Sequence, residues 1–382
     1  MSDDAAMPTT KLAPRDASRR DAPDSSLDPV GLRVVEAIRT RLLQGPDWTE
    51  EHEDGFSWWS YRFRQRFRVE GPIELGGLPT WWASFETDVL AGITGPDERT
   101  GFIAMAANRV SNLFETVLEE GRLRHRLRLY LLPETLDHRV ALLTDRALLS
   151  NVEAHRMADA FVEQAGEMGL ETERLRADES SHPVLGARPD PDAILGVPVQ
   201  IFLPLGQAPP PPERRPDLEA AAEMLRSMPW HRIDVRHLSS GPDGLRAIFA
   251  VDGAVGSYAL QLGVRHPALG LGALSLLHVT TPDLLRRRDG ETLFDAARRT
   301  SDTLNAAEWR TWEPLLSLGA WVPRRKPGTD ADDDDAPVAL AYPTFHPNAT
   351  LVPGLASELV SDAARRFAWV AGATVGRSTF SS

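Results

Sequence analysis

Two stretches of the sequence alternate arginine with large apolar residues, which is a pattern that could bind carboxylates or phosphates. The first runs from Phe56 to Val69, and the second runs from Arg122 to Leu131. Side chains alternate between the two faces of a β-strand, so each stretch predicts one strand with a polar face and a core face. The core face is expected to carry Trp59, Tyr61, Phe63, Phe67 and Val69 in the first strand and Leu123, Leu127, Leu129 and Leu131 in the second.

The polar side of these strands, called the arginine face below, has the chemistry of a binding surface. Guanidinium groups held on a rigid sheet can form paired hydrogen bonds with carboxylates or phosphates. Two tryptophans are expected to be exposed beside them and able to stack on a bound group. The candidate partner-binding residues are Trp58, Arg62, Arg64, Arg66, Arg68, Trp82, Arg122, Arg124, Arg126 and Arg128.

A second interpretation makes the arginine face an ion ladder within the sheet. Alternation places Glu86, Asp88, Glu115 and Glu119 of two further predicted strands on the same side as the arginines. Exposed ion pairs contribute about 0–1 kcal/mol each and keep a sheet face polar. Four carboxylates against eight arginines leave a positive surplus of four, so an acidic protein partner stays an open alternative to the ladder.

The second half of the chain predicts strands that are apolar on both faces. They run over residues 245–252, 257–265 and 271–280, where Leu274 and Leu276 oppose Ala273 and Leu277. A sheet that is apolar on both sides needs two covers. The expected second cover is the first half of the chain, and the alternative is an apolar surface around Leu274 and Leu276 that binds a second chain or a client protein.

Other reactive constellations are missing from the sequence. The chain has no cysteine, which excludes disulfides, thiolate metal sites and cysteine nucleophiles. The ten histidines lack metal-ligand spacing, and no Gly-x-Ser-x-Gly or complete phosphate loop occurs. The acidic run at 330 and 332–335 lacks the glycine and terminal glutamate of a calcium loop. We therefore expect no metal, no cofactor and no catalytic residue.

Composition narrows the class of protein further. The net charge of −13 disfavours a protein that coats nucleic acid. No apolar run approaches ~18 residues, so no membrane span is expected. The N-terminal stretch has acidic residues and no continuous apolar segment, which predicts a cytoplasmic location.

The order of predicted elements repeats along the chain. Each half begins with a helix that ends just before Trp48 or Trp230, continues with strands, and then forms a second helix. The second helices, at 101–114 and 291–304, align at an offset of 190 residues, which pairs Arg109 with Arg299. Two strands and a last helix close each half, so a tandem duplication is predicted.

These features predict an α+β protein of two similar repeats, each an antiparallel sheet with helices packed mainly on one face. The expected boundaries are a disordered tail at 1–28, a first repeat at 29–170, a Pro-rich linker at 171–213 with a candidate strand at 197–205, a second repeat at 214–375 and a C-terminal tail at 376–382.

The order helix, strands, helix, two strands, helix resembles the fold shared by type III secretion chaperones and the YbjN-like proteins. The resemblance implies protein binding rather than catalysis, and it transfers no site residues. Single domains of that group often pair as dimers. A duplicated chain is therefore expected to be a monomer with pseudo-dimeric repeats or a homodimer.

The function predicted from the sequence is that of a non-enzymatic chaperone or adaptor that binds an acidic or apolar segment of another protein. Two alternatives stay open. One is an enzyme of unknown reaction with a site in the cleft between the repeats. The other is nucleic-acid binding through the arginine face, which the acidic total disfavours.

Overall fold

The computed structural model describes residues 27–42, 48–59, 63–95, 97–111, 113–174, 217–228, 233–251, 253–266, 270–280, 285–325, 336–347 and 354–376. Arg62, nearly all of the predicted N-terminal tail, most of the predicted linker with its candidate strand, the acidic run at 330–335 and the residues after 376 lie outside these ranges.

The first repeat begins with a helix whose N-terminus is capped by Asp28. The Asp28 carboxylate accepts a hydrogen bond of 2.7 Å from the backbone N–H of Gly31, which satisfies a donor that has no partner within the helix. The elements then follow in the order α1 (Pro29–Arg41), β1 (Thr49–His52), β2 (Gly55–Trp59), β3 (Arg64–Leu75), β4 (Leu78–Thr94), α2 (Asp97–Ser111), β5 (Glu115–Glu119), β6 (Arg122–Leu131), the 3-10 turn η2 (Pro133–Thr135), α3 (Leu136–Glu167) and β7 (Glu171–Arg174).

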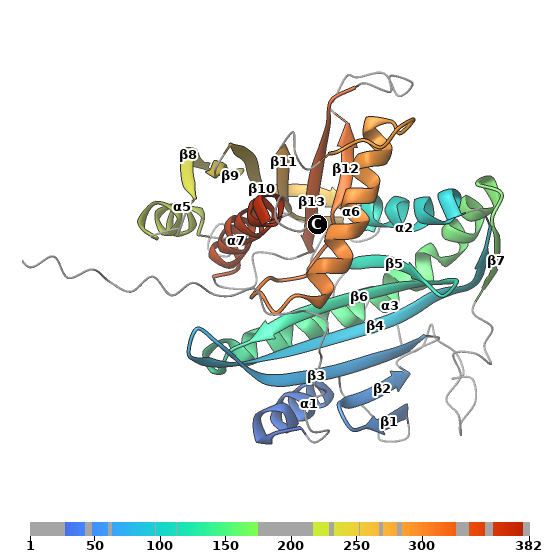
Figure 1. Cartoon of the computed structure of the whole chain (residues 1–382). Coiled ribbons are helices and arrows are strands. Elements are labelled where there is room, and N and C mark those ends of the chain that lie inside the picture. Colours follow the sequence, from blue (N-terminus) through green and yellow to red (C-terminus); the bar gives the residue numbers. More distant parts are fainter. Residues whose placement is uncertain are drawn as a thin grey trace, which may run out of the picture.

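The second repeat presents the same succession (Figure 1). Its first helix is also capped by an aspartate, since Asp217 accepts a hydrogen bond of 2.8 Å from the N–H of Ala220. The elements are α5 (Leu218–Ser227), β8 (Asp234–Gly241), β9 (Gly244–Val251), β10 (Ala254–His266), β11 (Gly270–Thr280), α6 (Leu293–Arg310), β12 (Val322–Arg325), β13 (Val338–Pro347) and α7 (Leu355–Gly376).

The two sheets have the same strand order. The first runs β1-β2-β3-β4-β6-β5 and the second β8-β9-β10-β11-β13-β12, with β7 added beside β4 in the first. All of these pairings are antiparallel. The α+β class and the two similar repeats predicted from the sequence are therefore confirmed.

A pair of asparagines fixes how the repeats correspond. The Asn108 side chain of α2 bonds both the N–H and the C=O of Thr116, at 2.6 and 2.7 Å. The Asn305 side chain of α6 does the same to Trp321, at 2.7 and 3.1 Å. These anchors pair Asn108 with Asn305. The helix alignment expected from the sequence, which pairs Arg109 with Arg299, is therefore displaced by about two helical turns.

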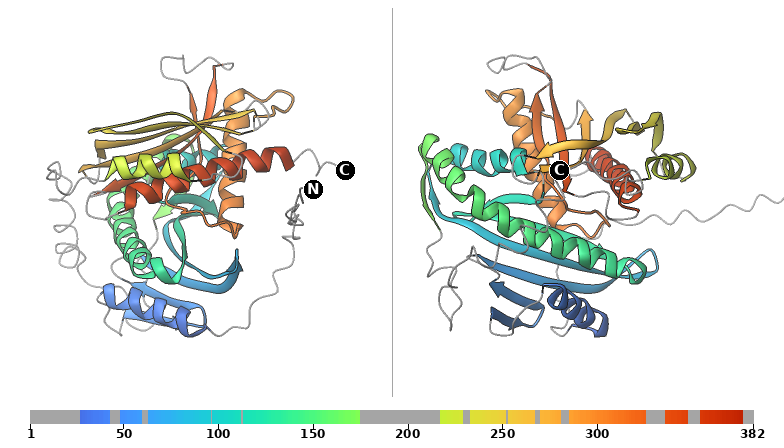
Figure 2. Two further views of the ribbon diagram at one scale, coloured as in Figure 1. Left: turned by 90° about the vertical axis from the view of Figure 1, so that its left-hand side faces the viewer. Right: turned by 180° about the vertical axis from the view of Figure 1, so that it is seen from behind.

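The repeats pack together around one continuous core. Residues of α3 and β6, such as Val140 and Leu131, belong to the same buried cluster as Leu316 and Leu359 of the second repeat. Figure 2 shows α5 and α7 on one face of the second sheet, and α7 contacts β9, β10 and β11. This helix-covered side of the second sheet is its inner face, and the opposite side is called its outer face below.

One strand expected from the sequence is two strands in the structure. The segment from Phe56 to Val69 reverses after Trp59, so β2 and β3 pair as a hairpin with Trp59 opposite Arg64. Each pair in this hairpin joins an odd-numbered to an even-numbered residue, so Trp58 lies on the core face and Trp59 on the arginine face. The reversal carries no glycine or proline signal in the sequence.

Candidate protein-binding surfaces

The arginine face exists as predicted across β3, β4 and β6. The register sets Glu86 of β4 opposite Arg66 of β3 on one side and Arg126 of β6 on the other. On β5, Glu115 lies opposite Arg126 and Glu119 opposite Arg122. The four carboxylates expected to accompany the arginines therefore share their face.

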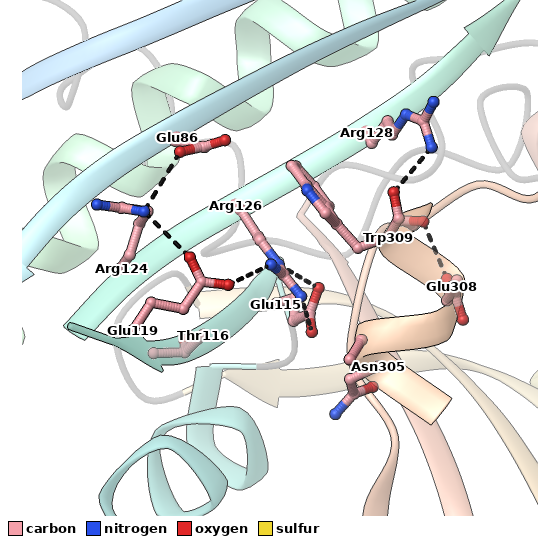
Figure 3. Close-up of polar contacts among 12 residues, drawn as sticks. Glu86, Glu115, Thr116, Glu119, Arg124, Arg126, Arg128, Asn305, Glu308 and Trp309 are labelled. Atoms are coloured by element: carbon pink, nitrogen blue, oxygen red, sulfur yellow. Dashed lines mark hydrogen bonds and ion pairs between the residues drawn. The ribbon is translucent and has the colours of Figure 1, made fainter. Parts of the chain in front are cut away.

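The charged groups of this face are joined by ion pairs. Arg124 lies 2.6 Å from Asp88, 3.1 Å from Glu119 and 3.6 Å from Glu86. Arg68 lies 3.4 Å from Glu86, and Arg122 lies 3.1 Å from Asp88. Figure 3 shows the chain of contacts from Glu86 through Arg124 and Glu119 to Arg126.

Three further carboxylates reduce the positive surplus of four expected from the sequence to one, and the seven carboxylates then equal in number the seven arginines of the face that the structure describes. Arg128 lies 3.3 Å from Glu70, Arg64 lies 4.0 Å from Glu50, and Arg66 pairs with Asp54. Each of the seven described arginines of the face thus has a carboxylate within 4.0 Å. Glu70 continues the alternation of Arg64, Arg66 and Arg68. The sequence pattern could therefore have placed this carboxylate on the arginine face.

Both tryptophans expected to be exposed are buried, which corrects the prediction that they stack on a ligand. Trp58 is 6% exposed and faces the core, where its ring lies 6.5 Å from that of Phe67. Trp82 does lie on the arginine face, but it is 2% exposed because Trp312 of the second repeat packs against it at 4.8 Å. The tryptophan of β2 that lies on the arginine face is Trp59, which was expected on the core face; it is buried, and the Arg64 guanidinium lies 5.7 Å from its ring.

Arg128 binds the second repeat directly. Its guanidinium donates hydrogen bonds of 2.8 and 2.9 Å to the carbonyl oxygens of Trp309 and Thr311, at the C-terminal end of α6. The same group lies 5.3 Å from the ring of Trp82 and 4.6 Å from that of Trp312. The carbonyl oxygens at the end of a helix lack intrahelical partners, so a cation there is favourable.

The segment that makes these contacts is longer in the second repeat than in the first. Eight residues separate the anchor Asn108 from Thr116, whereas sixteen separate Asn305 from Trp321. The additional residues carry Trp312 and bring Ser317 to β6, where the Ser317 N–H donates to the Arg128 carbonyl at 3.1 Å. We call residues 309–317 the clasp.

Beside the clasp lies a buried pair, Glu115 and Arg126. The two groups form a two-fold contact, with distances of 2.7 and 2.8 Å, and Trp309 covers the guanidinium at 4.4 Å. Burial raises the pKa of Glu115 to about 7, although Arg126 favours the charged carboxylate. Both carboxylate oxygens are taken by Arg126, so this group is not available as a free acid or base.

A second polar cluster holds the clasp in place from the other side. Glu308 accepts hydrogen bonds from Ser317 at 3.0 Å, Trp321 at 3.2 Å and Tyr342 at 3.3 Å, and it pairs with Arg366. Arg366 in turn lies 2.9 Å from Asp362. A cavity of about 10 Å³ lined by Tyr342, Asp362 and Arg366 lies in this region, and it has room for about one water molecule.

Of the apolar surface expected around Leu274 and Leu276, one residue is buried and the other is partly exposed. Both residues lie on the outer face of the second sheet, whereas Ala273 and Leu277 lie on the inner face and join the core shared by the repeats. Leu276 is 8% exposed and clusters with Val322 and Ala341. Leu274 is partly exposed.

The described residues contain no group of histidine and acidic side chains placed to hold a metal ion. Among the same residues, no helix has both the length and the apolar composition that crossing a bilayer requires. No family model matches the chain, and no curated protein or solved structure matches it either.

Proposed function

We propose that this protein is a non-enzymatic chaperone or adaptor that binds a segment of another protein. The observation that carries the proposal is the clasp. One repeat holds a polypeptide segment of the other through backbone carbonyl oxygens, a backbone N–H and tryptophan rings. Backbone contacts of this kind do not depend on a particular side-chain sequence, so a sheet face of this fold is suited to holding polypeptide.

The charged groups support binding over catalysis. Glu115 has a pKa in the neutral range, which is a property that catalytic acids share. Its two oxygens are held by Arg126 of the same repeat, whose guanidinium lies against the Trp309 ring, so the carboxylate is the partner in a buried structural ion pair. The paired arginines also argue against nucleic-acid binding, because phosphate groups would have to displace a carboxylate from each of them.

The remaining features of the proposal come from the sequence pattern. The repeated order of elements supports a relationship with the YbjN-like and secretion-chaperone-like fold group. Because the two repeats are joined in one chain, a single molecule provides two sheets of the same strand order. We place the protein in the cytoplasm, where its lack of cysteine is compatible with a reducing environment.

Photo-crosslinking tests whether the protein binds another polypeptide. A photoreactive amino acid is introduced singly at four exposed apolar positions on separate elements, Leu32, Leu78, Met228 and Val255. Each variant is irradiated in native cells. We expect one discrete polypeptide adduct at one or two positions, followed by binding of the identified purified partner at micromolar or lower Kd. Absence of a polypeptide adduct at all four positions would overturn the proposal.

A further inference from the structure

The cavity of about 10 Å³ in the second repeat lies between α7 and the inner face of the sheet. The sheet contributes Ser275 of β11 and Thr344 of β13, which are cross-strand partners, and α7 contributes Asp362 and Arg366. All four residues are at least nine-tenths buried. Hydroxyl, carboxylate and guanidinium groups therefore meet at one place inside the second repeat.

The asparagine anchors identify the equivalent place in the first repeat. The anchored residues are Thr116 and Trp321, which are therefore equivalent. In the register of the two strand pairs, His125 lies opposite Thr116, and Tyr342 lies at the position opposite Trp321. His125 of β6 and Tyr342 of β13 are thus equivalent too, and counting along the two strands from this pair relates the rest of the two sheets.

The first repeat fills this place with apolar side chains. Two residues beyond the equivalent pair, β6 carries Leu127 where β13 carries Thr344. Their cross-strand partners are Phe85 on β4 and Ser275 on β11. Phe85 and Leu127 are fully buried. The second repeat thus has two smaller residues with hydroxyl groups where the first repeat has a phenylalanine and a leucine, so its sheet leaves room for a polar group beneath α7.

Arg366 has one nitrogen left for a group in the cavity. Its two terminal nitrogens pair with Glu308 and Asp362, and Nη2 also donates to the carbonyl oxygen of Leu316 at 2.7 Å. Nε of the same side chain is buried and has no hydrogen-bond partner among the described residues. A buried donor without a partner is unfavourable, so this N–H requires an acceptor.

The size and the charges of the lining select that acceptor. A volume of about 10 Å³ holds about one water molecule and nothing larger. A cation would meet the Arg366 guanidinium, and an anion would meet the Asp362 carboxylate. Water can accept a hydrogen bond from Nε and donate two to the hydroxyl oxygens of Ser275 and Thr344, which gives the three bonds typical of a buried water molecule.

We propose that this cavity binds one water molecule, held by Arg366 Nε and the hydroxyl oxygens of Ser275 and Thr344, and that this water fixes Arg366 where it holds the clasp. Arg366 donates to the Leu316 carbonyl, and Asp362 accepts a hydrogen bond of 2.7 Å from the Leu316 N–H. Both backbone groups of this clasp residue are therefore bound by α7, and the water supports Arg366 from the side of the sheet. The inference is independent of what the protein binds.

A high-resolution crystal structure of the full chain tests the occupant. We expect density for one water molecule within about 3.2 Å of Arg366 Nε and of at least one of the two hydroxyl oxygens. Crystals soaked in bromide or rubidium should show no anomalous signal in the cavity. A cavity without density, or an anomalous peak from either ion, would overturn the inference.

Oxygen-17 relaxation dispersion tests the same site in solution, because it counts water molecules that stay bound for long times. The variant Ser275→Val removes a hydroxyl and adds a methyl group that fills the cavity, so we expect one long-lived water molecule fewer. The matched control Ser301→Val changes a buried serine of α6 that bonds the Ala297 carbonyl at 2.9 Å, and it should keep the wild-type number. Equal numbers in the wild type and Ser275→Val, with unchanged circular dichroism, would overturn the inference.

Amide hydrogen exchange tests the link to the clasp. In Ser275→Val, exchange of the Leu316 N–H should become at least tenfold faster relative to the Thr116 N–H, which is anchored in the first repeat and reports opening of the whole chain. Ser301→Val should change this ratio less than twofold. An unchanged ratio in Ser275→Val would overturn the inference, because the water would then not hold Arg366 against the clasp.

Discussion

Arg128 Nη1 lies 2.8 Å from the carbonyl oxygen of Trp309, so a side chain from a sheet of the first repeat caps the end of a helix in the second. An arginine expected to face a partner instead binds the chain's own second half. The contact sits between two tryptophan rings and is 5% exposed at the arginine, which makes the packing of the two repeats sensitive to this one residue.

Replacing this arginine tests the clasp. We expect Arg128→Ala to lower the free energy of unfolding by about 2–4 kcal/mol, because buried carbonyl oxygens lose their charged donor. Urea unfolding measures the effect. The control Arg122→Ala removes a 37%-exposed arginine from the same strand and is expected to cost ~1 kcal/mol or less. Similar costs for the two variants would contradict the role of the clasp.

The ion ladder predicts unequal effects at its two ends. Arg64→Gln removes a half-exposed group that lies 4.0 Å from Glu50, so the unfolding free energy should change by ~1 kcal/mol or less. Arg126→Gln leaves the buried carboxylate of Glu115 without its partner and should cost about 3 kcal/mol. Adding Glu115→Leu to the Arg126→Gln variant should recover part of that loss, because the uncompensated charge is then gone. A double variant no more stable than Arg126→Gln alone would count against the pair.

The pKa of Glu115 predicts a pH dependence of stability. Its folded-state pKa of about 7 lies above the usual value of 4.5, so the folded protein holds a proton that the unfolded chain releases between these values. The unfolding free energy contributed by this group is therefore full below pH 4.5 and falls as pH rises towards 7, by about 1–3 kcal/mol.

The variant Glu115→Gln isolates this titration. Burial lowers the pKa of His125 to about 3 and also lowers that of His346, and both histidines favour the folded state as pH rises through 6.5. They are present in both proteins, so the difference between wild type and Glu115→Gln should show the Glu115 contribution alone. A difference that is constant from pH 5 to 8 would show that the carboxylate stays charged.

The asparagine anchors provide a test of the duplication. Asn108→Ala leaves the backbone N–H and C=O of Thr116 without their partner, and Asn305→Ala does the same to Trp321. Each variant should therefore lower the unfolding free energy by about 1–3 kcal/mol. Chemical denaturation of the two variants measures this. Equivalent positions should show costs within a factor of two, whereas a full effect in one repeat and none in the other would speak against equivalent roles.

The sequence by itself determined the local elements and much of the arginine face. Alternation with a period of two placed Arg124, Arg126, Glu86 and Asp88 on one side, because neighbouring side chains of a strand must point to opposite faces. The repeated order of helices and strands predicted the two sheets, since each amphipathic element needs a cover of the same kind in both halves.

Tertiary structure determined what each sheet face contacts. The burial of Trp58 depended on a chain reversal that no glycine or proline marks, and one reversal exchanges the faces of every residue before it. The burial of Arg128 and Trp82 depended on the clasp, whose contacting residues lie 181 residues from Arg128 and 230 residues from Trp82 in sequence. Alternation assigns a side chain to a face, but only the packing of distant segments determines whether that face meets water, an ion-pair partner or the other repeat.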